Sequence, residues 1–246
     1  MKILITGVAG KIGTILAQSL RDEFQVRGVS LEKDWSMDGV EYFQGDILSA
    51  EALRTAMEGV EQVIHLAGSS HPSSSWEEVL RNNIEGAHNV FEAALGAGVR
   101  RVIFASSSHV TGTYTRQGLP MNPAMPVAPD NLYGVSKACG EAMGKYYSEI
   151  KGLSVICLRI GSFSFRDGPY PVQADATPLQ RRTRLLWLSH RDMIQLFRRC
   201  LLVENLPFAV FYGTSANTGA LWDLEDARRI LGYAPEDDAA PVTSGS

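Results

Sequence analysis

A tyrosine and a lysine four positions apart, Tyr133 and Lys137, are the residues of this sequence best suited to acid–base chemistry. They stand near the start of a stretch that predicts a long helix ending at about Glu149. Because four residues make about one helical turn, both side chains leave the same face. A phenol titrates near ~10, but a cation fixed within ~4–6 Å favours the phenolate and lowers the phenol's pKa. The pair predicts a phenol that exchanges protons with a substrate, although the same spacing also occurs in amphipathic surface helices.

A run of serines, Ser106 to Ser108, followed by His109, comes directly after a buried strand predicted over 101–105. Residues at the carboxyl end of a parallel strand face the ligand crevice. The Ser107 hydroxyl is therefore expected to meet Tyr133 and to orient a substrate oxygen. From His109 to Asn131 the chain has a proline at every third position between 120 and 129. We interpret this stretch as a stiff, irregular active-site loop in preference to a polyproline ligand.

The elements that must position these residues begin at the amino terminus. Residues 2–6 form a short apolar run typical of a buried parallel strand, and an amphipathic helix follows it. Between them lie Gly7, Gly10 and Gly13. This spacing allows a tight turn, a close approach of a pyrophosphate to the helix N-terminus and close helix packing, and so it predicts a dinucleotide site.

Further buried strands are predicted over 24–30, around 42–43, and over 62–66, 101–105, 153–160 and 208–212, with helices between them. Alternating strands and helices predict an α/β fold with a Rossmann-type, doubly wound parallel sheet. Residues 1–160 are expected to form the dinucleotide-binding core, including the catalytic helix. Residues 161–246 are expected to add a small substrate lobe and tail to what is one structural domain overall.

The overall composition favours a small soluble partner. The 246 residues are 45% hydrophobic and 20% charged, with a formal net charge of −4. That balance gives no electrostatic footprint for nucleic acid or for an anionic membrane. Three cysteines without CxxC spacing favour a reducing cytoplasm, and neither a membrane span nor a signal peptide is expected. No metal is expected in the site.

Several polar residues are interpreted as structural. Ser75 and Glu78 predict a capping box at the start of a helix near Trp76. His65 is expected to pack within the sheet, and Asn82 and Asn83 to hydrogen-bond nearby groups. Ser189 with Asp192 predicts a helix N-cap, which makes a structural role for His190 more plausible than a catalytic one.

Together, the three glycines, Asp46, His65 to Gly68, Ser107, and Tyr133 with Lys137 resemble the extended short-chain dehydrogenase/reductase superfamily. Further segments, at 104–109, 132–137, 159–162, 187–192 and 212–217, resemble uronate dehydrogenases and the related archaeal NAD-dependent glucose-6-phosphate dehydrogenases. This resemblance implies that Ser107, Tyr133 and Lys137 are catalytic. Three departures stand out: Ser108 replaces the usual Asn, Ser30 replaces the ribose-binding acid, and the segment 163–181 is longer than usual.

The resemblance also implies that NAD is the cofactor. NADP is the alternative, because Ser30 lacks the carboxylate that would repel a 2′-phosphate and Lys33 lies nearby in the sequence. Glu32 argues for NAD. The residues expected to bind the cofactor are Gly7, Gly10, Lys11, Ile12, Gly13, Ser30, Asp46, Ile47, Leu66, Ala67, Gly68, Tyr133, Lys137 and Ile160.

The substrate implied is a hexuronic acid, D-galacturonate or D-glucuronate, oxidised at its anomeric carbon to an aldarolactone. The residues expected to bind it are Ser70, Ser107, Ser108, His109, Tyr133, Ser162 and Arg182. Arg182 is expected to hold the carboxylate, with Arg184 as the substitute if the long loop shifts the register. The alternatives are glucose 6-phosphate oxidation, a nucleotide-sugar epimerase or dehydratase, and a non-catalytic dinucleotide sensor. A homo-oligomer is expected.

Overall fold

A seven-stranded parallel sheet forms the centre of the molecule, with strand order β3-β2-β1-β4-β5-β6-β7. The computed structural model describes residues 1–173 and 175–239. The strands are β1 Lys2–Thr6, β2 Gln25–Ser30, β3 Val40–Gln44, β4 Gln62–His65, β5 Arg101–Ser107, β6 Ser154–Ile160 and β7 Phe208–Gly213. Their order reverses between β1 and β4, where sheets of this kind bind ligands. The predicted doubly wound α/β fold is confirmed.

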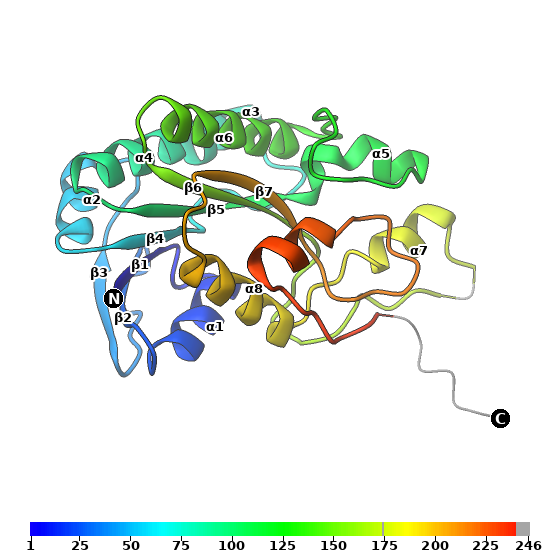
Figure 1. The fold of residues 1–246 in the computed structure, drawn as a ribbon, viewed down its shortest axis with the longest axis horizontal. Coiled ribbons are helices and arrows are strands. Elements are labelled where there is room, and N and C mark those ends of the chain that lie inside the picture. The colour runs from blue at the N-terminus through cyan, green and yellow to red at the C-terminus, as the bar shows by residue number, and fades with distance from the viewer. Residues whose placement is uncertain (174, 240–246) are drawn as a thin grey trace.

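Helices cover both faces of the sheet (Figure 1). The α-helices are α1 Lys11–Leu20, α2 Ala50–Met57, α3 Trp76–Val79, α4 Gly86–Gly96, α5 Gly112–Gln117, α6 Leu132–Glu149, α7 Pro178–Arg184 and α8 His190–Leu202. Short helices of other types are the π-helix η1 Leu80–Glu85, the 3-10 helix η2 Ser108–Thr111 and the π-helix η3 Ala227–Leu231. One core cluster joins α2, α4 and α6 to the sheet, and the other joins α1 and α8 to its opposite face.

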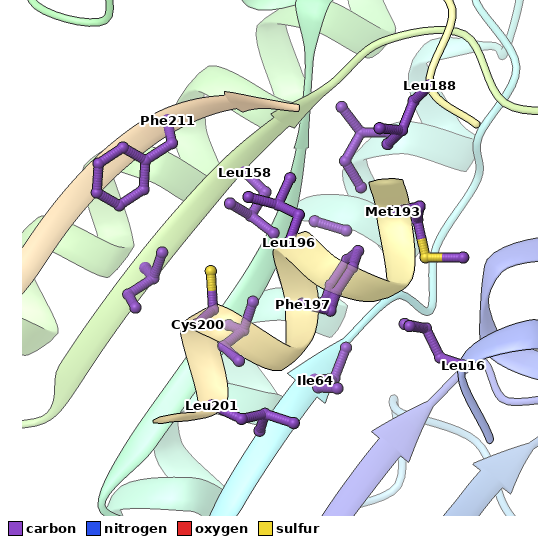
Figure 2. Packing of buried hydrophobic residues seen from close by; sticks show 14 of the residues in the cluster. Leu16, Ile64, Leu158, Leu188, Met193, Leu196, Phe197, Cys200, Leu201 and Phe211 are labelled. Carbon is purple, nitrogen blue, oxygen red and sulfur yellow. The ribbon is translucent and has the colours of Figure 1, made fainter. Parts of the chain in front are cut away.

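Helix α8 shows how the second cluster is built (Figure 2). Its residues Leu196, Phe197 and Cys200 are fully buried and face Ile64 of β4 and Leu158 of β6. Such apolar positions, three and four residues apart on a helix, form one stripe against the sheet. Because α8 and β7 both follow residue 160, the part of the chain predicted as a substrate lobe also completes the central layers. The division at that residue stays a prediction.

Helix α6 lies unusually close to the sheet because it carries glycines on its inner face. A Cβ at Gly140 would lie 2.2 Å from Cζ of Phe104, and one at Gly144 would lie 2.9 Å from Cγ1 of Val155. Any larger residue at these positions would push the helix away from β5 and β6. The close approach places the first turn of α6 at the carboxyl end of β5.

Three local predictions were incomplete. The stretch 109–131 was expected to be irregular, but it contains η2 and α5, and α5 ends at Gly118 in the left-handed conformation. The helix expected from Trp76 is interrupted by η1. The long loop of 163–181 gives way to α7, which starts at a capping box formed by Thr177 and Gln180. In the described residues, no helix is long and apolar enough to cross a bilayer.

Candidate active site

The turn between β1 and α1 has the geometry of a dinucleotide cradle. Gly7 has a φ of +70°, and a Cβ on it would lie 2.8 Å from the backbone nitrogen of Ala67. A Cβ at Gly13 would lie 2.4 Å from the Gly7 carbonyl oxygen. Gly10 is the N-cap of α1, so the helix N-terminus presents Lys11 and Ile12 without a capping side chain in front of them. An anionic pyrophosphate fits such a turn.

The carboxyl end of β4 forms the other side of this crevice. The Thr6 hydroxyl oxygen accepts hydrogen bonds from the backbone N–H groups of Leu66 and Ala67, at 3.2 and 3.3 Å. It also contacts Nδ1 of His65 at 2.8 Å. Burial, with a smaller effect of the nearby Lys137 charge, lowers the pKa of His65 to about 3. His65 is therefore a neutral sheet residue, as predicted, and the segment through Gly68 lies beside Gly7.

The adenosine side of the predicted site lies at the ends of β2 and β3. Ser30 is half-buried, and its hydroxyl lies 2.9 Å from that of Tyr42, so it is already used in a contact between the two strands. One carboxylate oxygen of Asp46 accepts the Leu48 backbone N–H at 2.9 Å, which fixes the turn before α2. Ile47, the next residue in the chain, is buried.

The structure brings Ser107, Tyr133 and Lys137 together. Ser107 is the last residue of β5, where it pairs in register with Ile160 of β6. Its hydroxyl accepts the His109 backbone N–H at 3.2 Å and lies close enough to the Tyr133 phenol to lower the phenol's pKa. The Lys137 ammonium lies 5.7 Å from the centroid of the Tyr133 ring. All three side chains are buried. Their contact follows from the predicted positions at the end of β5 and in the first turns of α6.

The electrostatics of this cluster differ from the sequence prediction. Burial raises the pKa of Tyr133 above its ordinary value, and the hydrogen bond with Ser107 lowers it by a smaller amount. The prediction that the Lys137 charge sets a lowered phenol pKa is therefore wrong for this structure. Burial also lowers the pKa of Lys137 itself, to about 8. Above about pH 8 the Lys137 side chain is therefore a neutral amine, which can accept a proton from the phenol.

A buried amide ties the cofactor crevice to the catalytic helix. Asn83, in η1, accepts the Ser69 backbone N–H at 2.7 Å and donates to the Ser69 carbonyl oxygen at 3.0 Å. The same amide group donates to the Ser136 hydroxyl at 2.9 Å, and Ser136 donates to the Tyr133 carbonyl oxygen. The predicted bonding of Asn83 to nearby groups is confirmed, but its link to α6 could not be found from sequence spacing.

His109 and Asp130 form a second polar group beside the phenol. The His109 and Tyr133 rings meet edge to face, with centroids 5.9 Å apart. Nδ1 of His109 lies 2.8 Å from Asp130, whose other carboxylate oxygen accepts from Nε of Arg116 at 3.1 Å. Burial alone would raise the pKa of the Asp130 carboxyl. The contacts with His109 and Arg116 lower it by a larger amount, so the pKa lies below its ordinary value. No spacing or motif in the sequence pointed to a role for Asp130.

The remaining predicted substrate residues are less closely joined to this cluster. Ser108 is buried beside Ser107, and Ser70 is exposed in the loop after β4. The buried Ser162 hydroxyl, just after β6, has no hydrogen-bond partner among the described residues. Arg182 donates to the carbonyl oxygens of Thr115 at 3.0 Å and Arg116 at 2.9 Å, so it holds the end of α5.

Two hollows elsewhere in the described structure are not lined by Ser107, Tyr133 or Lys137. One, of about 250 Å³, lies in the loop after β7 and includes Asn217, Trp222 and Arg228. The other, of about 570 Å³, lies between α7 and the segment before it and includes Tyr170 and Arg184. The candidate active site is therefore identified from its side chains and from the sheet topology, and neither hollow coincides with it.

The chain is similar to known sugar-oxidising enzymes. The family described as "NAD dependent epimerase/dehydratase family" matches residues 3–170. An NAD-dependent glucose-6-phosphate dehydrogenase of Haloferax volcanii is 34% identical, over 98% of this chain and 95% of the relative. A uronate dehydrogenase of Pseudomonas syringae pv. tomato is 35% identical, over 97% of this chain and 82% of the relative.

A solved structure agrees with these relatives. The crystal structure of a uronate dehydrogenase variant from Agrobacterium tumefaciens, complexed with NAD, has a TM-score of 0.84 and 31% sequence identity. The match covers 97% of this chain and 85% of that one. The likeness therefore extends over β7 and α8 as well as the dinucleotide-binding part.

Proposed function

This chain belongs to the NAD-dependent epimerase/dehydratase family of extended short-chain dehydrogenases/reductases, and from that membership we propose that it oxidises a hexuronic acid at the anomeric carbon. It is an NAD-dependent dehydrogenase. The proposed product is an aldarolactone made from D-galacturonate or D-glucuronate. The observation that carries the proposal is the contact between Ser107 and Tyr133 beside Lys137 at the edge of the sheet that faces the dinucleotide cradle.

In the proposed reaction, NAD when bound supplies the hydride acceptor for the sugar's C1. The Tyr133 phenolate removes the proton of the anomeric hydroxyl, so the C1–O bond becomes a carbonyl as the hydride leaves. Ser107 orients that oxygen through its hydroxyl. At a pH above about 8, where the Lys137 amine is neutral, it can take the proton from the Tyr133 phenol and so restore the phenolate. In this scheme Tyr133 and Lys137 transfer the proton, and Ser107 holds the reacting oxygen.

The proposed cofactor contacts follow the crevice between β1 and β4. The turn of Gly7, Gly10 and Gly13 would hold the pyrophosphate, and the segment from Leu66 to Gly68 would line the opposite side. Ser30 and Asp46 would face the adenosine, and Ile160 the nicotinamide side. Since Ser30 has no carboxylate to repel a 2′-phosphate, we expect preference for NAD over NADP by a smaller margin than an aspartate there would give.

The choice of a hexuronate depends on the sugar's C6 anion. A uronate carries a carboxylate there and glucose 6-phosphate a phosphate, and a guanidinium can pair with either. We propose Arg182 for this contact. Two of its N–H groups bind carbonyl oxygens, and a guanidinium has five. The unpartnered Ser162 hydroxyl supports a sugar subsite next to β6.

The second candidate is glucose 6-phosphate oxidation. It is favoured by the glucose-6-phosphate dehydrogenase relative, which is covered over 95% of its length, against 82% for the uronate dehydrogenase. A carboxylate and a phosphate bind the same donors, so the geometry of a single arginine does not separate the two sugars.

The experiment is an assay of NAD and NADP reduction by the purified protein with D-galacturonate, D-glucuronate, glucose 6-phosphate, galactose and glucose. The proposal expects kcat/KM to be highest for a uronate with NAD. Efficient turnover of glucose 6-phosphate and none of either uronate would move the assignment to the second candidate. Tightly bound NAD in the protein as purified, without net reduction by any sugar, would point to an epimerase.

We also propose a cytoplasmic homo-oligomer. All three cysteines are free, which suits a reducing compartment. Leu132, Val135, Tyr146 and Ile150 are each at least 40% exposed along one side of α6, which is more apolar surface than a solvated helix needs. Sedimentation equilibrium at micromolar concentration should give a multiple of the 26.9 kDa chain mass. A monomer that also stays monomeric with NAD and sugar would contradict this.

A further inference from the structure

A buried ion pair connects the catalytic helix to the sheet. Arg159 of β6 donates from Nε and from a terminal nitrogen to the two carboxylate oxygens of Glu141 of α6, at 2.9 and 2.8 Å. Their side chains are only 3% and 7% exposed. The Ser106 hydroxyl of β5 donates to the same carboxylate at 2.5 Å. Burial lowers the pKa of Arg159, but the bonds to Glu141 raise it more, so Arg159 keeps its positive charge.

The position of the pair matters more than its strength. Glu141 lies one turn beyond Lys137 on α6, and Ser106 directly precedes Ser107. Arg159 also lies over the Tyr212 ring, 5.5 Å from its centroid, and the Tyr212 hydroxyl contacts that of Thr111 in η2 at 2.9 Å. One network therefore spans α6, the ends of β5 and β6, β7, and the start of the active-site loop.

Stability alone does not require such a pair. Removing two charges from water costs about as much as their attraction returns, and well-packed apolar residues of similar size are often at least as stable. A role in fixing the register between two elements is the best-attested use of buried polar groups. Gly140 and Gly144 let α6 lie close against Phe104 and Val155. Glu141, directly after Gly140, adds a directional polar contact to this close packing.

We propose that the Glu141–Arg159 pair is a positioning device that sets the register of α6 along β5 and so holds the Tyr133 phenol against the Ser107 hydroxyl. The expected effect on turnover rests on the proposed function, whereas the expected effect on the phenol titration does not. A displacement of about 1 Å between reacting groups can cost roughly a hundredfold in rate. The bond between Ser107 and Tyr133 also lowers the phenol pKa. Losing the register should therefore slow turnover and move the phenol titration to higher pH.

The test replaces both charges with apolar residues in Glu141→Leu/Arg159→Met. We expect an unfolding temperature within a few degrees of the parent, a kcat lower by roughly 10- to 100-fold, and a KM changed less than about threefold. The ascending limb of the kcat–pH profile, which follows the loss of the phenol proton, should move to higher pH. If kcat and the profile both stay at the parent values, the pair does not position Tyr133 and the proposal fails.

A matched control removes a second guanidinium–carboxylate pair far from α6. Arg27 of β2, which is also buried, donates to Glu41 of β3 at 2.8 and 3.0 Å. Arg27→Met/Glu41→Leu should leave kcat and its pH profile at the parent values. An equal loss of kcat in this control would show that both pairs act through general stability. If the double variant at 141 and 159 does not fold, Arg159→Lys keeps the charge but not the paired bonds, and an unshifted profile there would also overturn the proposal.

A substrate-free measurement separates this inference from the proposed function. The Tyr133 phenol can be titrated by its ultraviolet difference spectrum, with the Tyr133→Phe variant subtracted. The phenol pKa should be higher in Glu141→Leu/Arg159→Met than in the parent, whether or not any sugar is oxidised. An equal phenol pKa in both proteins would overturn the positioning role, whereas a shifted pKa without uronate turnover would count only against the substrate assignment.

Discussion

At the scale of single residues, the proposed reaction depends on the Tyr133 phenol. Tyr133→Phe removes the group proposed to take the substrate proton, and general base catalysis contributes about 10²- to 10⁴-fold. We expect kcat to fall by that range while the Kd for NAD stays within a few-fold of the parent. Because burial raises the phenol pKa, the parent rate should rise with pH into the alkaline range. Retention of more than about a tenth of the activity would rule out Tyr133 as the base.

Lys137 is expected to reduce stability at neutral pH. Burial lowers its pKa in the folded chain from 10.5 to about 8. Below pH 8 both states carry the proton, so the folded state bears the full desolvation cost, and this cost shrinks between pH 8 and about 10.5. Lys137→Met should therefore raise the free energy of unfolding by about 3 kcal/mol at pH 7, and by less at pH 10, while abolishing turnover. Urea unfolding at both pH values tests this, and a variant less stable than the parent at pH 7 would contradict it.

The proximity of the proposed catalytic residues could be predicted from the sequence because local rules place them. Helical spacing aligns Tyr133 with Lys137, and a strand end delivers Ser107. Asn83 and Glu141 act through partners 53 and 18 positions away in the chain, which no single-sequence pattern encodes. The phenol pKa was mispredicted for the same reason, since burial depends on the whole tertiary structure.

At the scale of elements, α5 and α7 were missed because neither is stable by itself. Each is 6 or 7 residues long, well below the length at which an isolated helix persists in water. Arg182 of α7 holds α5 through the Thr115 and Arg116 carbonyl groups. By contrast, the strands and long helices have periodic apolar residues and capping side chains such as Asn131 and Ser189, and these were predicted to within a few residues.

Arg182 holds α5 and is also proposed to bind the anion of the sugar, so replacing it tests the substrate assignment. Arg182→Ala should raise KM for a uronate sharply. The fall in kcat/KM should correspond to a loss of about 2–5 kcal/mol of transition-state stabilisation if the anion pair is desolvated. Galactose and glucose should be poor substrates of the parent and little affected by the change. Arg184→Ala is the matched control, because Arg184 binds the carbonyl oxygens of Tyr170 and Ala239 instead, and its KM should stay near that of the parent.

If Arg182→Ala loses kcat/KM equally on charged and on neutral sugars, Arg182 supports α5 and does not bind the anion. A second arm distinguishes the two roles directly. If Arg182 only supports α5, Arg182→Ala should lower the unfolding temperature while KM for the uronate stays unchanged.

At the scale of the whole molecule, His65 should contribute to the loss of stability in acid. Its pKa is about 3 when folded and 6.5 when exposed, so the unfolded chain binds the proton first and stability falls as the pH drops from 6.5 toward 3. His65→Asn keeps a polar partner for Thr6 but cannot titrate. Between pH 7 and 4 this variant should lose about 2–3 kcal/mol less than the parent, as measured by urea unfolding. Equal losses in both proteins would show that His65 does not control acid unfolding.

The placement of α8 has a consequence for the way the chain is made. One face of the sheet, including Ile64 and Leu158, is covered by a helix that begins only at His190 (Figure 2). A ribosome-bound chain that has not yet released residues 190–202 therefore presents this apolar face uncovered, although β1, β4, β5 and β6 have already emerged. Such surfaces favour chaperone binding or aggregation during synthesis. Chains arrested before residue 190 should be cleaved by protease much faster than chains arrested after the tail has emerged, and equal rates would show that the sheet is protected without α8.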